Sequence, residues 1–245
     1  MNSILNISAY LFTPLHDLSA WREACLGQAQ AKALKGTILL SPEGINLFLA
    51  GLADQVEGFL LWLRNQEGLA DLVAKKSWSE QQPFGKLLVK IKTEIIRMNH
   101  PAIVPAQGRA PAVKPIDLRR WLDQGQDDQG QAMVMLDTRN AFEVAHGKFA
   151  QALDWGLHRF SEFPQAAREH FAEIQGKTVI SYCTGGIRCE KAAIFLRELG
   201  HKRVYQLDGG ILQYFEDTGG AHFEGDCFVF DERIALAPDL SAKPL

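Results

Sequence analysis

The chain has 245 residues, 47% of them hydrophobic and 22% charged, with a formal net charge of −3 at pH 7. These values are ordinary for a globular protein, and the length fits one large or two small domains. No apolar run is long enough to span a membrane and the N-terminus lacks a signal-peptide pattern. These features exclude a membrane-spanning or secreted class and predict a cytoplasmic protein.

Cysteines and histidines are dispersed along the chain. The four cysteines do not form the spacing of a disulfide framework: Cys25, Cys183, Cys189 and Cys227. Reduced thiols are typical of the cytoplasm. The seven histidines show no two-histidine, one-carboxylate arrangement. The sequence therefore indicates no metal site and no resident cofactor.

Positive charge is concentrated in residues 72–120, which hold ten Lys or Arg against three acidic residues and so carry +7. The rest of the chain then carries −10. A basic stretch in an acidic protein is a candidate surface for a polyanion, which makes Lys86, Lys90 and Lys92 candidates for RNA binding. The same lysines are equally typical of a protected edge strand.

Residues 1–98 alternate strand and helix patterns and are predicted to form the first domain. The order strand, helix, strand, strand, helix, strand predicts a ferredoxin-like (acylphosphatase-like) α+β domain. Residues 99–114 are rich in Pro and Ala without periodicity and are predicted to be a linker. The predicted strands of the first domain cover 5–12, 37–40, 45–50 and 87–96, and its helices cover 18–34 and 55–65.

Residues 115–220 are predicted to form a second domain with alternating strands and helices. This alternation predicts an α/β domain with a parallel sheet that binds ligands at the carboxyl ends of its strands. Residues 221–245 are predicted to be a tail that packs back on the fold. The predicted strands cover 133–136, 178–182 and 204–207, and the helices cover 116–122, 190–199 and 211–216.

The stretch that says most about function connects the strand at 178–182 to the next helix. Backbone N–H groups of a tight, glycine-bearing loop and the N-terminus of a helix both favour negative charge. A neighbouring arginine favours a thiolate further, and the thiolate is the nucleophilic form of cysteine. We therefore predict a catalytic Cys183 and an active-site loop of Thr184, Gly185, Gly186, Ile187, Arg188 and Cys189.

The spacing Cys183-x4-Arg188 is one residue shorter than the Cys-x5-Arg loop of cysteine-dependent phosphatases. It resembles the active loop of rhodanese domains, whose cysteine carries a transferable sulfur as a persulfide. The arrangement Asp137-x-Arg139 after a strand, followed by Glu143-x3-Gly-x-Phe149, is similar to rhodanese domains as well. A merely structural cysteine is the alternative, but two glycines and an arginine are poorly suited to plain packing.

Three separated motifs extend the resemblance over nearly the whole chain. They are residues 182–191, Glu43-Gly44-Ile45-Asn46 and residues 228–233. In this order they are similar to the bacterial rhodanese-domain tRNA uridine hydroxylases, a UPF-type family. Members join an N-terminal ferredoxin-like domain to a rhodanese domain, and their catalytic cysteine corresponds to Cys183.

This resemblance implies an oxidoreductase that converts the wobble uridine (position 34) of tRNA to 5-hydroxyuridine. It also implies molecular oxygen as co-substrate and the tRNA anticodon arm as partner. Longer members carry a Cys-rich C-terminal extension that these residues do not include, so no metal bound by such an extension is expected. The loop alone equally supports a sulfurtransferase that forms a Cys persulfide from thiosulfate or a persulfide donor. A non-catalytic binding module is a third interpretation, and the intact Cys183 and Arg188 argue against it.

Several residues keep two interpretations. Cys189 either resolves an oxidised Cys183 or packs the first helical turn, and packing is favoured. Asp137 and Arg139 either form a buried pair that supports the loop, which is favoured, or Arg139 faces substrate. Glu43 and Asn46 either line an interdomain cleft or are turn and edge residues.

Overall fold

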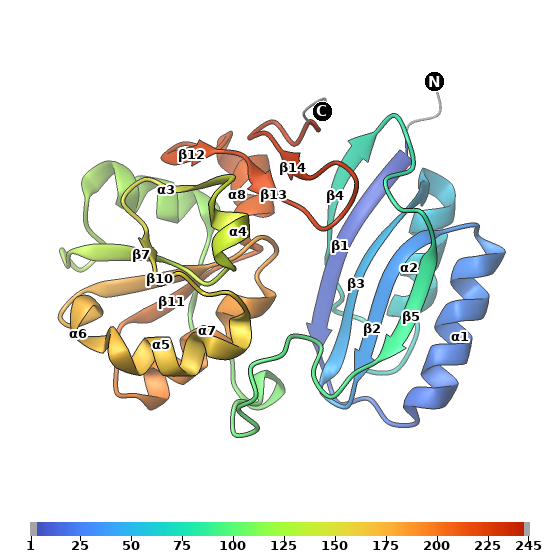
Figure 1. Cartoon of the computed structure of the whole chain (residues 1–245), viewed down its shortest axis with the longest axis horizontal. Coiled ribbons are helices and arrows are strands. Elements are labelled where there is room, and N and C mark those ends of the chain that lie inside the picture. The colour runs from blue at the N-terminus through green and yellow to red at the C-terminus, as the bar shows by residue number, and fades with distance from the viewer. Residues whose placement is uncertain (1–3, 243–245) are drawn as a thin grey trace. The chain divides into compact units, whose positions relative to one another are not determined.

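The computed structural model describes residues 4–242, which divide into two compact units (Figure 1). The first unit comprises residues 4–97 and 230–233, and the second comprises residues 98–229 and 234–242. The ends of the predicted first domain and tail, residues 1–3 and 243–245, lie outside the described residues.

The first unit is a five-stranded sheet with two helices on one face (Figure 1). The strand order is β4-β1-β3-β2-β5, with β1 and β2 separated by β3. This split β-α-β arrangement confirms the predicted ferredoxin-like α+β fold. Its elements are β1 (Ile4–Phe12), α1 (Leu18–Ala31), β2 (Lys35–Ser41), β3 (Gly44–Leu52), α2 (Ala53–Arg64), β4 (Ala74–Ser79) and β5 (Leu87–Ile91).

Alternating side chains decide which face of this sheet the helices cover. Leu5 and Ile7 of β1 and Leu47 and Leu49 of β3 are buried in one cluster with Phe59 of α2. Successive strand residues point to opposite faces, so these four side chains lie on the same face as the helices. The apolar alternation of β1 and β3 therefore builds the core of the first unit.

Strand β4 was not predicted from the sequence, and the last strand of this domain was predicted too long. β4 pairs antiparallel with β1 at one edge, whereas β5 pairs parallel with β2 at the opposite edge and ends at Ile91 rather than residue 96. The β4 sequence Ala-Lys-Lys-Ser-Trp-Ser lacks the β-branched alternation that signals a strand. An edge position tolerates such a sequence, because lysines there discourage pairing with another chain.

The second unit is built on a five-stranded sheet in which every neighbouring pair is parallel, in the order β6-β11-β10-β7-β9. This confirms the predicted α/β architecture. All five residues of β10 are buried, as is typical of a central parallel strand. Its main elements are β6 (Ala112–Val113), α3 (Pro115–Gln124), β7 (Met133–Asp137), α4 (Ala141–Val144), β8 (Gly147–Phe149), β9 (Leu153–Asp154), α5 (Phe163–Glu169), α6 (Phe171–Ile174), β10 (Thr178–Tyr182), α7 (Ile187–Glu198), β11 (Val204–Leu207) and α8 (Gly210–Thr218).

Residues 98–114, which include the predicted linker, pack on the second unit. Ile103 is buried, the His100 ring lies 5.0 Å from that of Phe195, and β6 joins the sheet beside β11. The segment also contains a 3-10 turn, η1 (Pro105–Gln107), and a second such turn, η2 (Phe160–Glu162), precedes α5. Such short elements leave no periodic signal in a sequence.

The predicted tail, from residue 221 onward, forms three short strands. β12 (Phe223–Gly225) pairs with β8, and β13 (Cys227–Phe228) and β14 (Ala235–Leu236) form a hairpin. The tip of that hairpin, residues 230–233, belongs to the first unit. There the Phe230 ring lies 6.2 Å from Phe48, and Arg233 Nη1 donates a hydrogen bond to Ser77 Oγ at 2.8 Å.

No helix within residues 4–242 combines the length and the apolar character needed to cross a bilayer.

Candidate active site

Cys183 follows β10 directly, and its sulfur faces the start of α7. The N–H of Gly186 donates to Cys183 Sγ at 3.2 Å. Gly186 caps the helix with a φ of 104°, a conformation that favours glycine. The Cys183 side chain is fully buried. The loop thus directs a backbone donor at the sulfur, which stabilises negative charge there.

The environment of Cys183 favours its thiolate. Burial raises the pKa of Cys183, but the Cys189 thiol, the charge of Arg188 and the backbone N–H groups of both residues outweigh it and lower the pKa from 9.0 to about 5. The pKa of Cys189 moves the other way, because burial and the neighbouring Cys183 both raise it. At neutral pH the pair is therefore one thiolate beside one thiol.

The ultraviolet absorbance of the Cys183 thiolate should titrate far below that of an ordinary thiol. The difference between wild type and Cys183→Ser should show a midpoint near pH 5. Because the folded-state pKa is depressed, the contribution of this group to stability is complete above pH 9 and is lost as the pH falls through 5. A midpoint above neutral pH would contradict the proposed electrostatics.

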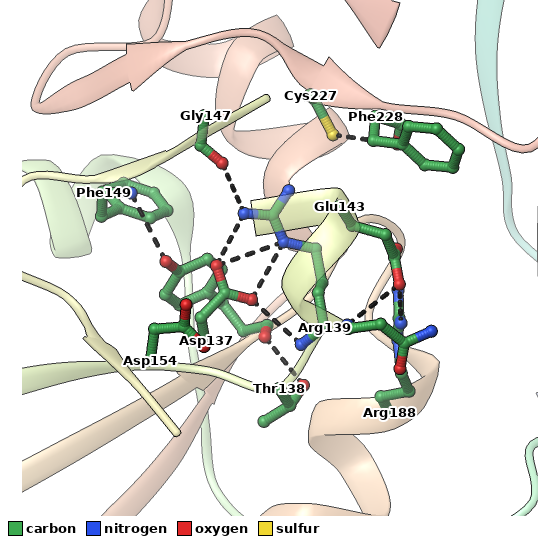
Figure 2. A network of polar contacts seen from close by, with 12 residues as sticks. Asp137, Thr138, Arg139, Glu143, Gly147, Phe149, Asp154, Arg188, Cys227 and Phe228 are labelled. Carbon is green, nitrogen blue, oxygen red and sulfur yellow. Dashed lines mark hydrogen bonds and ion pairs between the residues drawn. The ribbon is translucent and has the colours of Figure 1, made fainter. Parts of the chain in front are cut away.

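Arg188 is held by a buried carboxylate rather than standing alone. Its guanidinium donates from Nη2 to Glu143 Oε2 at 2.7 Å and from Nη1 to Oε1 at 2.5 Å, and both side chains are nearly inaccessible. Glu143 also accepts the N–H of Asn140, which caps α4. A bidentate pair of this kind fixes the guanidinium in one orientation beside the loop (Figure 2).

A second buried pair supports the strand that carries the cysteine. Arg139 Nη2 donates to Asp137 Oδ2 at 2.6 Å and to the carbonyl of Gly147 at 2.6 Å (Figure 2). The Arg139 guanidinium lies 5.8 Å from the Tyr182 ring, and Thr138 Oγ1 donates to the Tyr182 carbonyl at 2.8 Å. The end of β7 is thereby joined to the residue that precedes Cys183.

The N-terminus of α8 holds the other side of the loop. The N–H of Ile211 donates to the Cys183 carbonyl at 3.0 Å, and that of Leu212 donates to the Thr184 carbonyl at 3.1 Å. Gly210 lies against the loop with a φ of 66°, and a Cβ there would stand 2.5 Å from the Cys183 carbonyl oxygen. The absence of a side chain at Gly210 therefore allows two backbone segments to touch.

Gly210→Ala should destabilise the protein more than an alanine at another glycine of similar φ, because the new Cβ would also clash with the active loop. The substitution adds both an unfavourable φ and a clash with loop backbone, so we expect a loss of about 2–4 kcal/mol of stability together with lower activity. Gly219→Ala is the matched control, because Gly219 has a φ of 67° and a Cβ at that position would meet nothing within 4 Å. Equal melting temperatures for the two variants would contradict the role of the contact.

The two candidate site residues of the first unit, Glu43 and Asn46, form hydrogen bonds with the backbone of that unit. Glu43 Oε1 accepts the N–H of Ile95 at 2.7 Å, and Asn46 Nδ2 donates to the Ile95 carbonyl at 3.3 Å. Both side chains thus hold the segment that follows β5 against the β2–β3 hairpin. This use of a polar pair in an apolar hairpin was not foreseen from the sequence.

The basic stretch does not form one continuous surface. Lys86, Lys90 and Lys92 are exposed at and beside the edge strand β5, whereas Lys76 lies on β4 at the opposite edge and contacts Glu57. In the second unit Arg109 contacts Glu190 and Asp208, and Arg120 contacts Asp117 and Asp128. Part of the positive charge is therefore neutralised locally.

A cavity in the second unit lies apart from the active loop. It is a cavity of about 410 Å³ between Trp121, Tyr205 and Lys114, and none of its lining residues belongs to the loop. Among residues 4–242, no three His, Cys, Asp or Glu side chains gather in a metal-binding arrangement.

Glu143, Gly147 and Gly210 are supporting residues whose roles were not predicted from the sequence. A signal was present, because Glu143 and Gly147 belong to the Glu-x3-Gly-x-Phe motif. The structure gives each a partner, Arg188 for Glu143 and Arg139 for Gly147. The missing information was which residues they contact in the folded chain.

Comparison with known proteins covers both units. Residues 4–95 match the UPF0176 acylphosphatase like domain, and residues 118–217 match the rhodanese-like domain. The tRNA uridine(34) hydroxylase of Bordetella pertussis is 62% identical over 243 residues, covering 99% of this chain and 100% of that protein. The tRNA uridine(34) hydroxylase of Delftia acidovorans is 60% identical over 245 residues, covering 100% of this chain and 93% of that protein. On this full-length similarity, the chain belongs to the tRNA uridine(34) hydroxylase family.

Proposed function

We propose that this protein hydroxylates the wobble uridine of tRNA, at position 34, to 5-hydroxyuridine. The observation that carries the proposal is the 62% identity, over essentially the whole of both chains, to a relative named for this activity. Such similarity favours hydroxylation over the sulfurtransferase alternative, which rests on the loop alone. Molecular oxygen is the proposed co-substrate. Since the substrate is tRNA and all four cysteines are free thiols, we place the protein in the cytoplasm.

Cys183 is the proposed nucleophile. Its thiolate adds to C6 of uracil, which forms a carbon–sulfur bond and makes C5 electron-rich and open to oxidation. Gly186 and the other loop residues hold the sulfur, and Arg188 supplies positive charge beside it. Asp137 and Arg139 support the loop from β7, while Glu43 and Asn46 organise the first unit. This route predicts a covalent Cys183 adduct with tRNA that carries 5-fluorouridine at position 34.

The direct test measures nucleosides by mass spectrometry in tRNA from cells that lack this protein and from the same cells after its return. We expect 5-hydroxyuridine and its derivatives to disappear and to be restored by wild type. If they persist while a thiolated nucleoside falls, sulfur transfer is the activity instead.

The tRNA anticodon arm is the proposed partner, and the exposed lysines beside β5 are its proposed phosphate contacts. Replacing Lys86, Lys90 and Lys92 with glutamine should reduce the slope of log affinity against log salt by about 2–3, since each phosphate contact contributes about 0.7–0.9. The charge-matched control replaces Lys177, Lys202 and Arg203, which precede β10 and β11 and so lie at the end of the sheet away from Cys183. Unchanged binding in the first variant would place the tRNA elsewhere.

A further inference from the structure

The sulfur atoms of Cys183 and Cys189 both contact the backbone of one residue, Gly186. Gly186 donates its N–H to Cys183 Sγ at 3.2 Å, and its carbonyl accepts the Cys189 thiol at 2.9 Å. The Cys189 thiol is also among the groups that lower the pKa of Cys183. Both side chains are fully buried and both are free thiols. The two buried sulfurs therefore share Gly186 as a hydrogen-bonding partner.

Their protonation states are complementary. The pKa of Cys183 is lowered and that of Cys189 is raised, so a nucleophilic thiolate faces a protonated thiol. Packing alone, the interpretation favoured from the sequence, does not require that both sulfurs bond to the same glycine. A dithiol in this arrangement is typical of a pair that exchanges two electrons through a disulfide.

The electron balance of the proposed reaction calls for such a pair. Molecular oxygen accepts four electrons when one of its atoms enters the product and the other leaves as water. Oxidation of uridine to 5-hydroxyuridine supplies two of them. Conversion of two thiols to one disulfide supplies the remaining two electrons and two protons.

We propose, building on the proposed hydroxylation, that Cys189 is a second catalytic residue and that the Cys183–Cys189 dithiol is the reductant for oxygen. After Cys183 has added to C6, the electron pair on C5 bonds to oxygen, and the resulting peroxide takes the proton of the Cys189 thiol to become a hydroperoxide. The Cys189 thiolate then attacks the distal oxygen, which breaks the oxygen–oxygen bond, leaves an alkoxide on C5 and makes Cys189 a sulfenic acid.

The remaining steps close the cycle. Transfer of the C5 proton to the alkoxide and departure of the Cys183 thiolate restore the double bond and release 5-hydroxyuridine. Cys183 then attacks the Cys189 sulfenic sulfur, forming the disulfide and displacing hydroxide. The hydroxide becomes water by taking up the proton that Cys183 gave to solvent when its thiolate formed. The sum is uridine, oxygen and two thiols giving 5-hydroxyuridine, water and one disulfide. An external thiol must then reduce the disulfide before the next turnover.

A single-turnover experiment tests the proposal. The full-length protein is reduced, freed of small thiols without oxygen, and mixed with a tRNA transcript that carries uridine at position 34. Oxygen is then admitted, and the reaction is quenched with acid and an alkylating agent. We expect about one 5-hydroxyuridine per protein with one Cys183–Cys189 disulfide, and repeated turnover only when a dithiol is added. Cys25, buried in α1, is the internal control and should be alkylated only after unfolding, in reduced form.

The arms of this experiment separate the possible outcomes. Without tRNA or without oxygen, both cysteines should remain reduced. Cys189→Ser should lower the single-turnover yield at least about tenfold while keeping the Cys183 adduct with 5-fluorouridine tRNA, which shows that the nucleophile is intact. Product from wild type with both thiols still reduced would overturn the dithiol role and leave the hydroxylation standing. A disulfide that forms as fast without tRNA would also overturn the dithiol role. If no 5-hydroxyuridine forms even with added dithiol, both the dithiol role and the proposed hydroxylation are wrong.

Discussion

Replacing Cys183 with serine should lower the rate of uridine hydroxylation by about a thousandfold or more, because the thiolate is the only group in the loop that is proposed to bond to the base. A serine hydroxyl stays protonated near neutral pH, so Gly186 and Arg188 would have no anion to stabilise. The measurement is the rate of 5-hydroxyuridine formation on a tRNA transcript, followed by mass spectrometry.

The same variant should leave tRNA binding almost unchanged, and its tRNA affinity is the control. Its melting temperature near neutral pH should fall, because serine lacks the stability that the depressed pKa of Cys183 contributes. Cys25→Ala removes a buried sulfur from α1 of the first unit and should retain hydroxylation. If Cys183→Ser keeps a tenth or more of the wild-type rate, a nucleophilic role for Cys183 is wrong.

Glu143→Ala should destabilise the protein by about 3–5 kcal/mol, because it leaves the Arg188 guanidinium buried without its carboxylate. Glu143 is fully buried and forms both hydrogen bonds of the bidentate pair. The substitution also removes the acceptor that caps α4 at Asn140. The free energy of unfolding from denaturant titration measures the effect, and hydroxylation should fall with it because Arg188 loses its orientation.

The pair of Glu162 and Arg159 offers a control, since its side chains are 36% and 77% exposed, although Glu162 also accepts the N–H of His158. Glu162→Ala should leave the melting temperature close to that of wild type, because solvent screens an exposed pair. A Glu143→Ala protein as stable as Glu162→Ala would show that Arg188 finds another partner or water. In that case the buried pair would not be what fixes the loop.

Local patterns were sufficient to predict the main architecture and the reactive cysteine. The apolar run of β10, the glycines after Cys183 and the helix of α7 are contiguous, so their arrangement follows from the chain itself. Alternating apolar residues likewise predicted β1 and β3. These signals depend on neighbours along the sequence, where backbone geometry dictates which side chains share a face.

Pairings between distant residues could not be predicted in this way. Glu143 and Arg188 are 45 residues apart, and only the parallel alignment of β7 and β10 brings their loops together. Gly210 contacts the active loop for the same reason. β4 was not predicted because it is an edge strand. Its lysine and serine residues lack the alternation of apolar and polar side chains that marks a strand with one covered face.

The path of the tail has a consequence for any attempt to divide this protein. A fragment that ends at residue 97 contains every strand and helix of the first unit, yet it lacks residues 230–233. It would lose the ring beside Phe48 and the guanidinium that binds Ser77. No single division of the chain therefore yields the complete first unit. To be complete, an isolated first unit would need residues 230–233 joined to residue 97 by an artificial linker.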